Sequence, residues 1–138
     1  MVDLKKTGFS RTKSMELTLW DEFILEISPP PEWNQMENLE EVKQNVEAAL
    51  RLIKNQPVLI LAHIPDFPQS DDARKYYLEH FSHTKAIAMV GKSFIKNIIG
   101  NLLLTTFSPA KNTKIKIFNT REEGLNWLLK QNQLMLSA

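Results

Sequence analysis

Short apolar segments alternate with amphipathic helical segments along most of this chain, and this alternation constrains the fold more than any other feature. Residues 58–64 are apolar almost throughout, which is typical of a strand buried on both faces. Further short strands are predicted at 86–90 and 114–118, and helical spacing is predicted at 38–55, 71–81, 93–107 and from 120 onward. Strands that alternate with helices indicate a parallel sheet with right-handed crossovers.

Two apolar–polar alternating segments, 15–20 and 23–28, come before the first helix. Their junction at Asp21 and Glu22 predicts an antiparallel hairpin, and the prolines at 29–31 end the second strand. We therefore expect an α/β domain with a mixed, mostly parallel sheet of about five strands, an N-terminal antiparallel hairpin and four flanking helices. The 138 residues suit one domain over 15–138, preceded by a polar segment, 1–14, for which disorder is an open alternative.

Composition excludes several classes of function. The chain has no cysteine, which removes disulfides, thiolate metal sites, iron–sulfur clusters and a cysteine nucleophile. No apolar run approaches the length needed to span a bilayer, and the polar start lacks a signal-peptide core, so we expect a cytoplasmic protein with no transmembrane segment. Residues 1–69 carry a net charge of −4 and residues 70–138 a net charge of +5. This asymmetry could attract anionic partners, but a solvated face explains it more simply.

The candidate catalytic and ligating residues form no complete set. Gly91-Lys92-Ser93 resembles the end of a phosphate-binding loop, but Ala86 stands where that motif needs a glycine. His80 and His83 have the spacing of two metal ligands without further ligands nearby, and His80 falls on an apolar stripe that predicts a core position. We therefore predict no metal site and no cofactor.

Two further functions can be compared with the sequence: catalysis by a Ser-His-Asp set and binding of nucleic acid. His63 and Asp66 follow the central strand at the sheet edge where open α/β folds bind ligands, and Ser70 is nearby in sequence. A Ser-His-Asp set there lacks the Gly-x-Ser-x-Gly elbow, so a non-enzymatic protein is the stronger prediction. The aromatic residues have core spacing and are not interleaved with arginine, which argues against nucleic acid as a partner.

The segment 93–107 is apolar around more than half of its helical circumference. A helix on one face of a sheet needs only an apolar stripe. The excess could pack on a neighbouring helix, cover a second subunit, or enclose an apolar ligand. The candidate binding residues are Phe94, Ile95, Ile98 and Leu102, with Lys92 and Lys96 placed for an anionic headgroup.

Five segments carry a family resemblance: PVLIL (57–61), ARKYY (73–77), KAIAMV (85–90), IIGN (98–101) and EEGLNWL (122–128). Over residues 15–130 the chain resembles the STAS-like superfamily, also described as SpoIIAA-like, which shares a core with lipid-binding Sec14-type domains. The resemblance implies a non-enzymatic regulatory or protein-interaction domain that binds a protein partner or a second copy of itself. The alternative that it implies is a binder of a small apolar or lipid-like ligand.

The resemblance also implies a switch position. Anti-sigma-factor antagonists of this superfamily open the helix after the central strand with a phosphorylatable serine, and Ser70 occupies that place here. The local sequence is Gln69-Ser70-Asp71-Asp72 instead of the usual Asp-Ser-Ser-Gly. Adjacent acids repel a phosphate, so the helix N-cap is the simpler role for Ser70.

Overall fold

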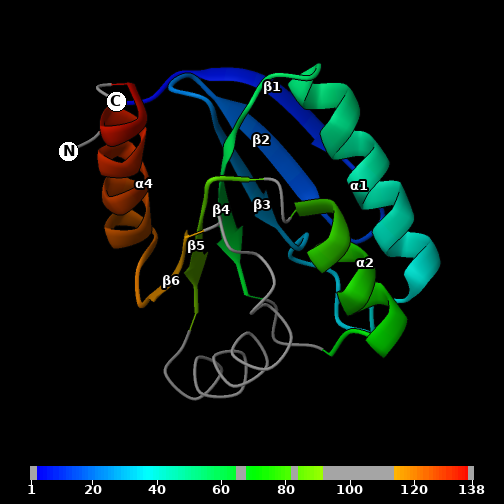
Figure 1. Cartoon of the computed structure of the whole chain (residues 1–138). Helices are drawn as coiled ribbons and strands as arrows, with labels where there is room; N and C mark the ends of the chain where they lie inside the picture. The colour runs from blue at the N-terminus through cyan, green and yellow to red at the C-terminus, as the bar shows by residue number, and fades with distance from the viewer. Residues whose placement is uncertain (1–2, 65–67, 82–83, 92–113, 137–138) are drawn as a thin grey trace.

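The computed structural model describes residues 3–64, 68–81, 84–91 and 114–136. One sheet contains, in sequence order, β1 (Lys6–Arg11), β2 (Glu16–Trp20), β3 (Ile24–Ser28), β4 (Leu59–His63), β5 (Ala86–Val90) and β6 (Lys114–Phe118). Strands β1 to β3 form an antiparallel meander, and β3 to β6 are parallel (Figure 1). The α/β class and the N-terminal antiparallel hairpin are therefore confirmed.

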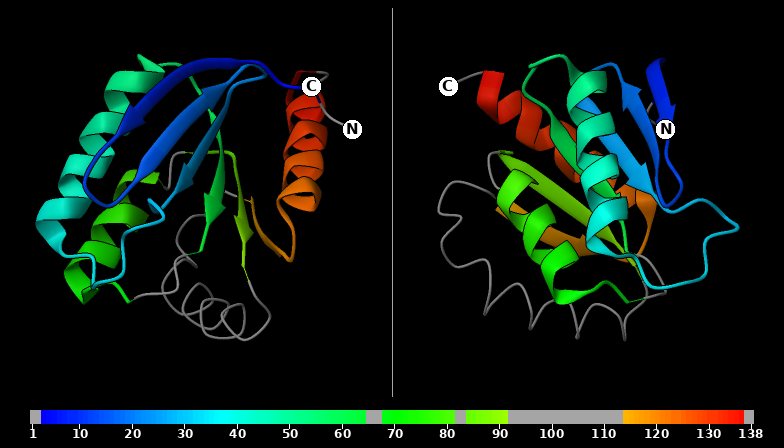
Figure 2. Two further views of the ribbon diagram at one scale, coloured as in Figure 1. Left: turned by 180° about the vertical axis from the view of Figure 1, so that it is seen from behind. Right: turned by 90° about the vertical axis from the view of Figure 1, so that its right-hand side faces the viewer.

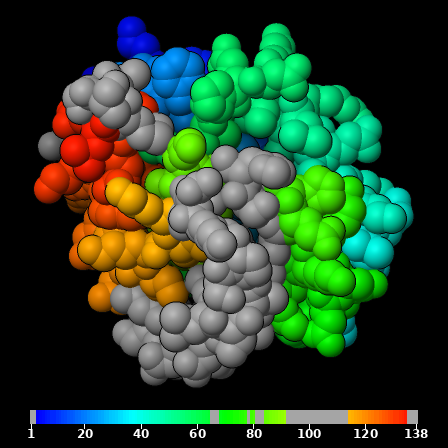
Figure 3. Space-filling model, viewed as in Figure 1, coloured from blue at the N-terminus to red at the C-terminus, as the bar shows by residue number. Residues whose placement is uncertain are grey.

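Three helices are described, and they cover opposite faces of the sheet. Helices α1 (Leu39–Ile53) and α2 (Asp71–Phe81) lie together on one face, and α4 (Arg121–Leu136) lies on the other (Figure 2). In the space-filling view, α1 and α2 adjoin each other on the right and α4 lies on the left (Figure 3). Leu25 and Ile60 belong to the core on the α1 side, whereas Leu59 and Leu61 belong to the core on the α4 side. Successive side chains of a strand point to opposite faces, so β4 must be apolar at nearly every position.

The strand count is six and not about five, because Lys6–Arg11 pairs with β2 inside the segment 1–14. This strand lacks an apolar alternation, since only Gly8 and Ser10 are even partly buried. A Cβ atom at Gly8 would lie 2.8 Å from Leu52 Cδ1, so the glycine lets α1 approach the strand closely. The fourth expected helix, over 93–107, lies outside the described residues.

The turn between β2 and β3 differs from the sequence-based expectation. The second strand was expected to begin at Phe23, but it begins at Ile24. Glu22 and Phe23 adopt φ angles of 64° and 59°, in the left-handed region that glycine and asparagine prefer. Tight hairpins need positive φ angles to match the strand twist, and two non-glycine residues supply them here. Phe23 consequently leaves the sheet, and 48% of its surface is exposed.

We expect Glu22→Gly to raise the free energy of unfolding by about 0.5–1 kcal/mol, because glycine adopts a positive φ angle without the Cβ penalty. The Glu22 side chain is exposed, so little packing is lost. Urea denaturation monitored by circular dichroism measures the change. As a control, Glu47→Gly in the middle of α1 should lower stability by about 1 kcal/mol. Destabilisation by both glycines would show that the turn is unstrained.

Candidate functional site

The carboxyl ends of the four parallel strands meet at one edge of the sheet, which is the lower edge in Figure 1. The turn between β1 and β2 reaches the same edge, since Glu16 pairs with both Arg11 and Ser28. Two groups of polar side chains lie at or near this edge, one on each face of the sheet, and Trp20 reaches the second group from the other end of β2, where it pairs with Ile24. The Glu37 cluster, on the α1 side, contains Thr12, Ser14, Glu37, Asn45, Gln69 and Tyr77. The Glu26 cluster, on the α4 side, contains Trp20, Glu26, His63 and Arg121.

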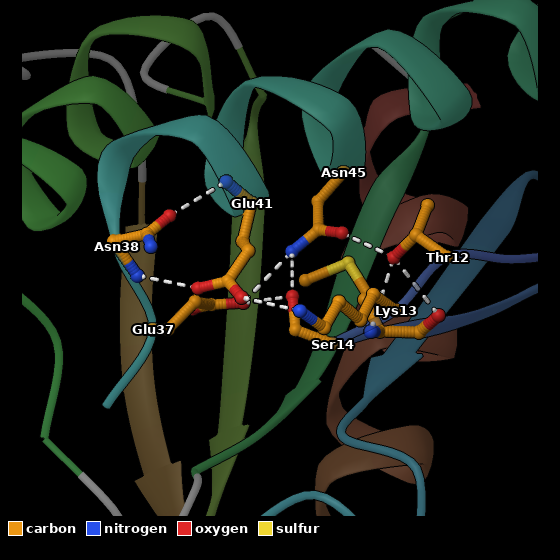
Figure 4. Close-up of polar contacts among 8 residues, drawn as sticks. Thr12, Lys13, Ser14, Glu37, Asn38, Glu41 and Asn45 are labelled. Atoms are coloured by element: carbon orange, nitrogen blue, oxygen red, sulfur yellow. Dashed lines mark hydrogen bonds and ion pairs between the residues drawn. The ribbon is translucent and has the colours of Figure 1, made fainter. Parts of the chain in front are cut away.

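Glu37 provides a buried carboxylate, with only 3% of the residue exposed. Its Oε2 accepts hydrogen bonds from Ser14 Oγ at 2.7 Å, Asn45 Nδ2 at 2.8 Å and the Tyr77 hydroxyl at 3.0 Å. Its Oε1 accepts one from Gln69 Nε2 at 2.7 Å. Figure 4 shows Ser14 and Asn45 converging on this carboxylate from the turn and from α1. All four donors are neutral groups.

Local signals explain how Glu37 reaches this place. Asn38 caps α1 in a reciprocal capping box, in which Asn38 Oδ1 accepts from the Glu41 amide and Glu41 Oε1 accepts from the Asn38 amide (Figure 4). The box fixes the direction in which the chain enters α1. Two backbone hydrogen bonds then join Glu37 to the segment before α2, from the Glu37 amide to Pro68 and from the Ser70 amide to Glu37.

The Glu37 cluster is a structural centre. Burial, with the nearby charge of Glu37 adding to it, raises the pKa of Tyr77, so that its hydroxyl remains a donor. The Asn45 amide nitrogen also lies 2.8 Å from Ser14 Oγ and from the Tyr77 hydroxyl, so the donors support one another. These contacts join the β1–β2 turn, α1, α2 and the segment before α2, and they occupy the carboxylate that an acid or base catalyst would need.

We expect Asn45→Ala to lower the free energy of unfolding by about 2–4 kcal/mol, because it leaves a buried carboxylate short of a donor. The neighbouring exposed Gln44→Ala is the matched control and should change stability by less than about 0.5 kcal/mol. Urea denaturation of both variants distinguishes them. Equal effects would mean that the cluster contributes no stability.

The Glu26 cluster surrounds a second carboxylate. Arg121 binds Glu26 with two parallel hydrogen bonds, from Nε to Oε2 at 2.8 Å and from Nη2 to Oε1 at 2.9 Å. His63 Nε2 lies 2.6 Å from Oε2, and Trp20 Nε1 donates to Oε1 at 2.9 Å. The Arg121 guanidinium also lies over the Trp20 ring, 5.7 Å from its centre.

Close packing of α4 brings Arg121 to this position. A Cβ atom at Gly124 would lie 3.2 Å from Leu61 Cδ1 and 3.3 Å from Val90 Cγ2, so the glycine lets α4 lie close against β4 and β5. Thr120 Oγ1 accepts a hydrogen bond from the Glu123 amide, as an N-cap does, and donates to Glu123 Oε1, so the helix begins after Thr120. Arg121 is therefore placed beside β3, although 95 residues separate it from Glu26.

The pKa of the Glu26 carboxyl depends on burial and on three hydrogen bonds that oppose the effect of burial. Burial alone would raise the pKa of this carboxyl, but hydrogen bonds from His63, Arg121 and Trp20 outweigh burial and lower it to about 2. The carboxylate is therefore ionised and acts only as an acceptor, so His63 Nε2 carries the hydrogen between them. The hydrogen bond to Glu26 also raises the pKa of Arg121. His63 Nδ1 makes no hydrogen bond to any residue that the structure describes.

We expect Glu26→Gln to lower stability at pH 7 by about 1–3 kcal/mol, with a defined dependence on pH. The folded-state pKa of about 2 lies below the reference value of 4.5, so the carboxylate stabilises the fold above pH 4.5. That contribution is lost as the pH falls from 4.5 towards 2. Denaturation series of wild type and variant should therefore converge in this range. A stability difference that stays constant down to pH 2 would contradict the assignment.

The two described residues of the possible Ser-His-Asp set, His63 and Ser70, each contact another side chain. His63 contacts Glu26, and Asp66 lies outside the described residues. Ser70 Oγ donates to Asp72 Oδ1 at 2.6 Å, which lowers the pKa of Asp72, and it accepts from the Ala73 amide as an N-cap does. The six candidate binding residues also fall outside the described part: Phe94, Ile95, Ile98, Leu102, Lys92 and Lys96.

His80 is exposed, so its expected core position is wrong. Its ring stacks on Tyr76, with 4.0 Å between centroids, and its Nδ1 lies 2.9 Å from the Tyr76 carbonyl oxygen. Sequence reasoning also missed both carboxylates. Glu26 had one signal in the sequence, since it is a single acid inside an apolar strand, and Glu37 directly precedes the helix predicted at 38–55.

One protein family matches most of the chain. Its model, described as a domain of unknown function (DUF7793), matches residues 24–132. No curated protein and no solved structure matches the chain. Among the described residues, no group of three or more acidic, histidine or cysteine side chains could hold a metal ion. No helix in that part of the chain has both the length and the apolar character needed to cross a membrane.

Proposed function

The chain belongs to the DUF7793 family, and we propose that it is a non-enzymatic, STAS-like protein-interaction domain. The observation that carries this proposal is the open part of the sheet on the α4 side. Helix α4 packs on β4, β5 and β6, and the described helices leave much of β1 and β2 open on this side (Figure 2). We call this surface the meander face and define it by Phe9, Arg11, Glu16, Thr18 and Trp20.

The composition of the meander face favours binding. Strand pairing places Phe9 beside Thr18, and 50% of the Phe9 surface is exposed. Cations lie over both of its aromatic rings, Lys6 over Phe9 and Arg121 over Trp20. Aromatic and arginine side chains are enriched in the parts of protein interfaces that carry binding energy. A polar sheet face with an exposed phenylalanine at its outer strand therefore suits a partner protein or a second copy of this chain.

Binding of a partner on the meander face is favoured over addition of a partner's strand beside the outer strand β1. Strand β1 is an outer strand, but its register shifts between Lys6 and Gly8, and charged side chains begin and end it. Bulges and charges on outer strands oppose the addition of another strand. The internal use of both carboxylates, Glu26 and Glu37, likewise supports a binding role rather than acid–base catalysis.

Two finer parts of the hypothesis have less support. The STAS-like relationship and a phosphorylation switch at Ser70 stay predictions from sequence, and the Ser70 contact with Asp72 favours an N-cap. The alternative function, a binder of a small apolar or lipid-like ligand, depends on residues of the segment 92–107. Since that segment lies outside the described residues, no described contact favours this alternative.

We expect Phe9→Glu to weaken binding through the meander face at least tenfold, because it places a charge on the most exposed aromatic side chain of that face. Light scattering after size-exclusion chromatography, over a concentration series, measures self-association. Leu50→Glu is the matched control, since Leu50 is 54% exposed but lies on α1. It should leave association unchanged.

A different protein partner is tested in cells with a photo-crosslinking amino acid at Thr18, and with the same group at the exposed Gln44 as control. We expect a discrete product from position 18 alone, which Phe9→Glu abolishes. A protein that is monomeric at every concentration and gives no such product contradicts the proposed function.

A further inference from the structure

Arg121 uses only part of its hydrogen-bonding capacity. A guanidinium carries five N–H donors in a fixed plane, and Glu26 accepts from Nε and Nη2. Three N–H groups remain, one on Nη2 and two on Nη1. The Nη1–Nη2 edge therefore presents a second parallel pair of donors, which we call the outer edge of Arg121. No residue that the structure describes accepts a hydrogen bond from it.

The outer edge is held in a fixed orientation. The two hydrogen bonds to Glu26 define the guanidinium plane, and the Trp20 ring lies against it. The Glu26 side chain is only 13% exposed, whereas the Arg121 side chain is 43% exposed. The inner edge is thus bound within the protein while the rest of the group reaches solvent. A donor pair that is already oriented loses less entropy on binding a ligand.

The other arginines lack this combination. Arg51 and Arg74 each pair with an acid on their own helix, Glu47 and Asp71, and neither has an aromatic ring against it in the described structure. Arg11 contacts two different acids, Glu16 and Glu32, instead of holding one carboxylate with both nitrogens of an edge. Among the described arginines, Arg121 alone combines a bidentate carboxylate with an aromatic ring against it, and it follows β6 at the edge of the sheet where open α/β folds bind ligands.

We propose that the outer edge of Arg121 binds an oxyanion of a ligand, a carboxylate or a phosphate group, through two parallel N–H···O hydrogen bonds. Glu26 and Trp20 are positioning residues for this site. Because the ionised Glu26 balances the charge of Arg121, attraction depends on the geometry of the donors more than on net charge. The site does not require the protein partner proposed above, since a free anion and an anion on a partner have the same chemistry, although Trp20 belongs both to this site and to the meander face.

The experiment is a titration of the full chain with inorganic phosphate and, separately, with acetate, at constant ionic strength set by chloride. NMR signals of the arginine side-chain N–H groups report binding at Arg121 directly. We expect saturable shifts of the Arg121 signals, with a dissociation constant in the millimolar range, since one bidentate contact gives about that affinity. Saturation by phosphate alone identifies a phosphate ligand, and saturation by acetate alone identifies a carboxylate.

Arg121→Lys separates geometry from charge, because lysine keeps the charge but has no planar donor pair. We expect this variant to bind at least tenfold more weakly, as followed by backbone amide shifts of residues 120–123. Arg51→Lys is the control and should bind as wild type does. If Arg121→Lys fails to fold, the wild-type Arg121 signals still decide the question. Non-saturating shifts in both titrations, or equal binding by wild type and Arg121→Lys, overturn the proposal.

Discussion

The burial of the Glu37 carboxylate, with no cation of the described residues in contact with it, is the constraint on which the rest of this fold depends. An ionised carboxylate removed from water costs several kcal/mol unless hydrogen bonds replace its hydration. Here the replacement comes from four separate places in the chain: the β1–β2 turn, α1, α2 and the segment before α2. None of these segments can leave without exposing or orphaning the carboxylate, so they are coupled in folding.

The Glu26 and Glu37 carboxylates differ in whether the side chains that bind them keep free hydrogen-bonding groups among the described residues. Glu37 is surrounded by neutral donors whose capacity is used within the cluster, which makes a rigid junction. Glu26 is held by Arg121 and His63, and each of these side chains retains nitrogen atoms that make no hydrogen bond to any described residue. The Glu37 carboxylate therefore stabilises packing on the α1 side of the sheet. The Glu26 carboxylate, on the α4 side, orients the side chains for which we propose ligand binding.

Elements that follow from local sequence patterns could be predicted from the sequence. The apolar run that became β4 and the helical spacing over 38–55 that became α1 were predicted and are confirmed. Strand β1 was missed because its partly buried residues are Gly8 and Ser10, which carry no apolar signal. The clusters were missed for a different reason. Glu26 and Arg121 are 95 residues apart, and only the sheet register together with the close approach of Gly124 brings them into contact.

The β1–β2 hairpin lies outside the family match but takes part in both polar clusters. The match begins at the first residue of β3, so the β1–β2 hairpin precedes it. Yet that hairpin supplies Ser14 to the carboxylate of Glu37 and Trp20 to the carboxylate of Glu26. It is thus an integral part of this domain, because both clusters are incomplete without it. The proposed protein-binding face lies on the hairpin, whereas the outer edge of Arg121 lies within the matched segment, and Trp20 joins the two because it belongs to the face and lies against the Arg121 guanidinium.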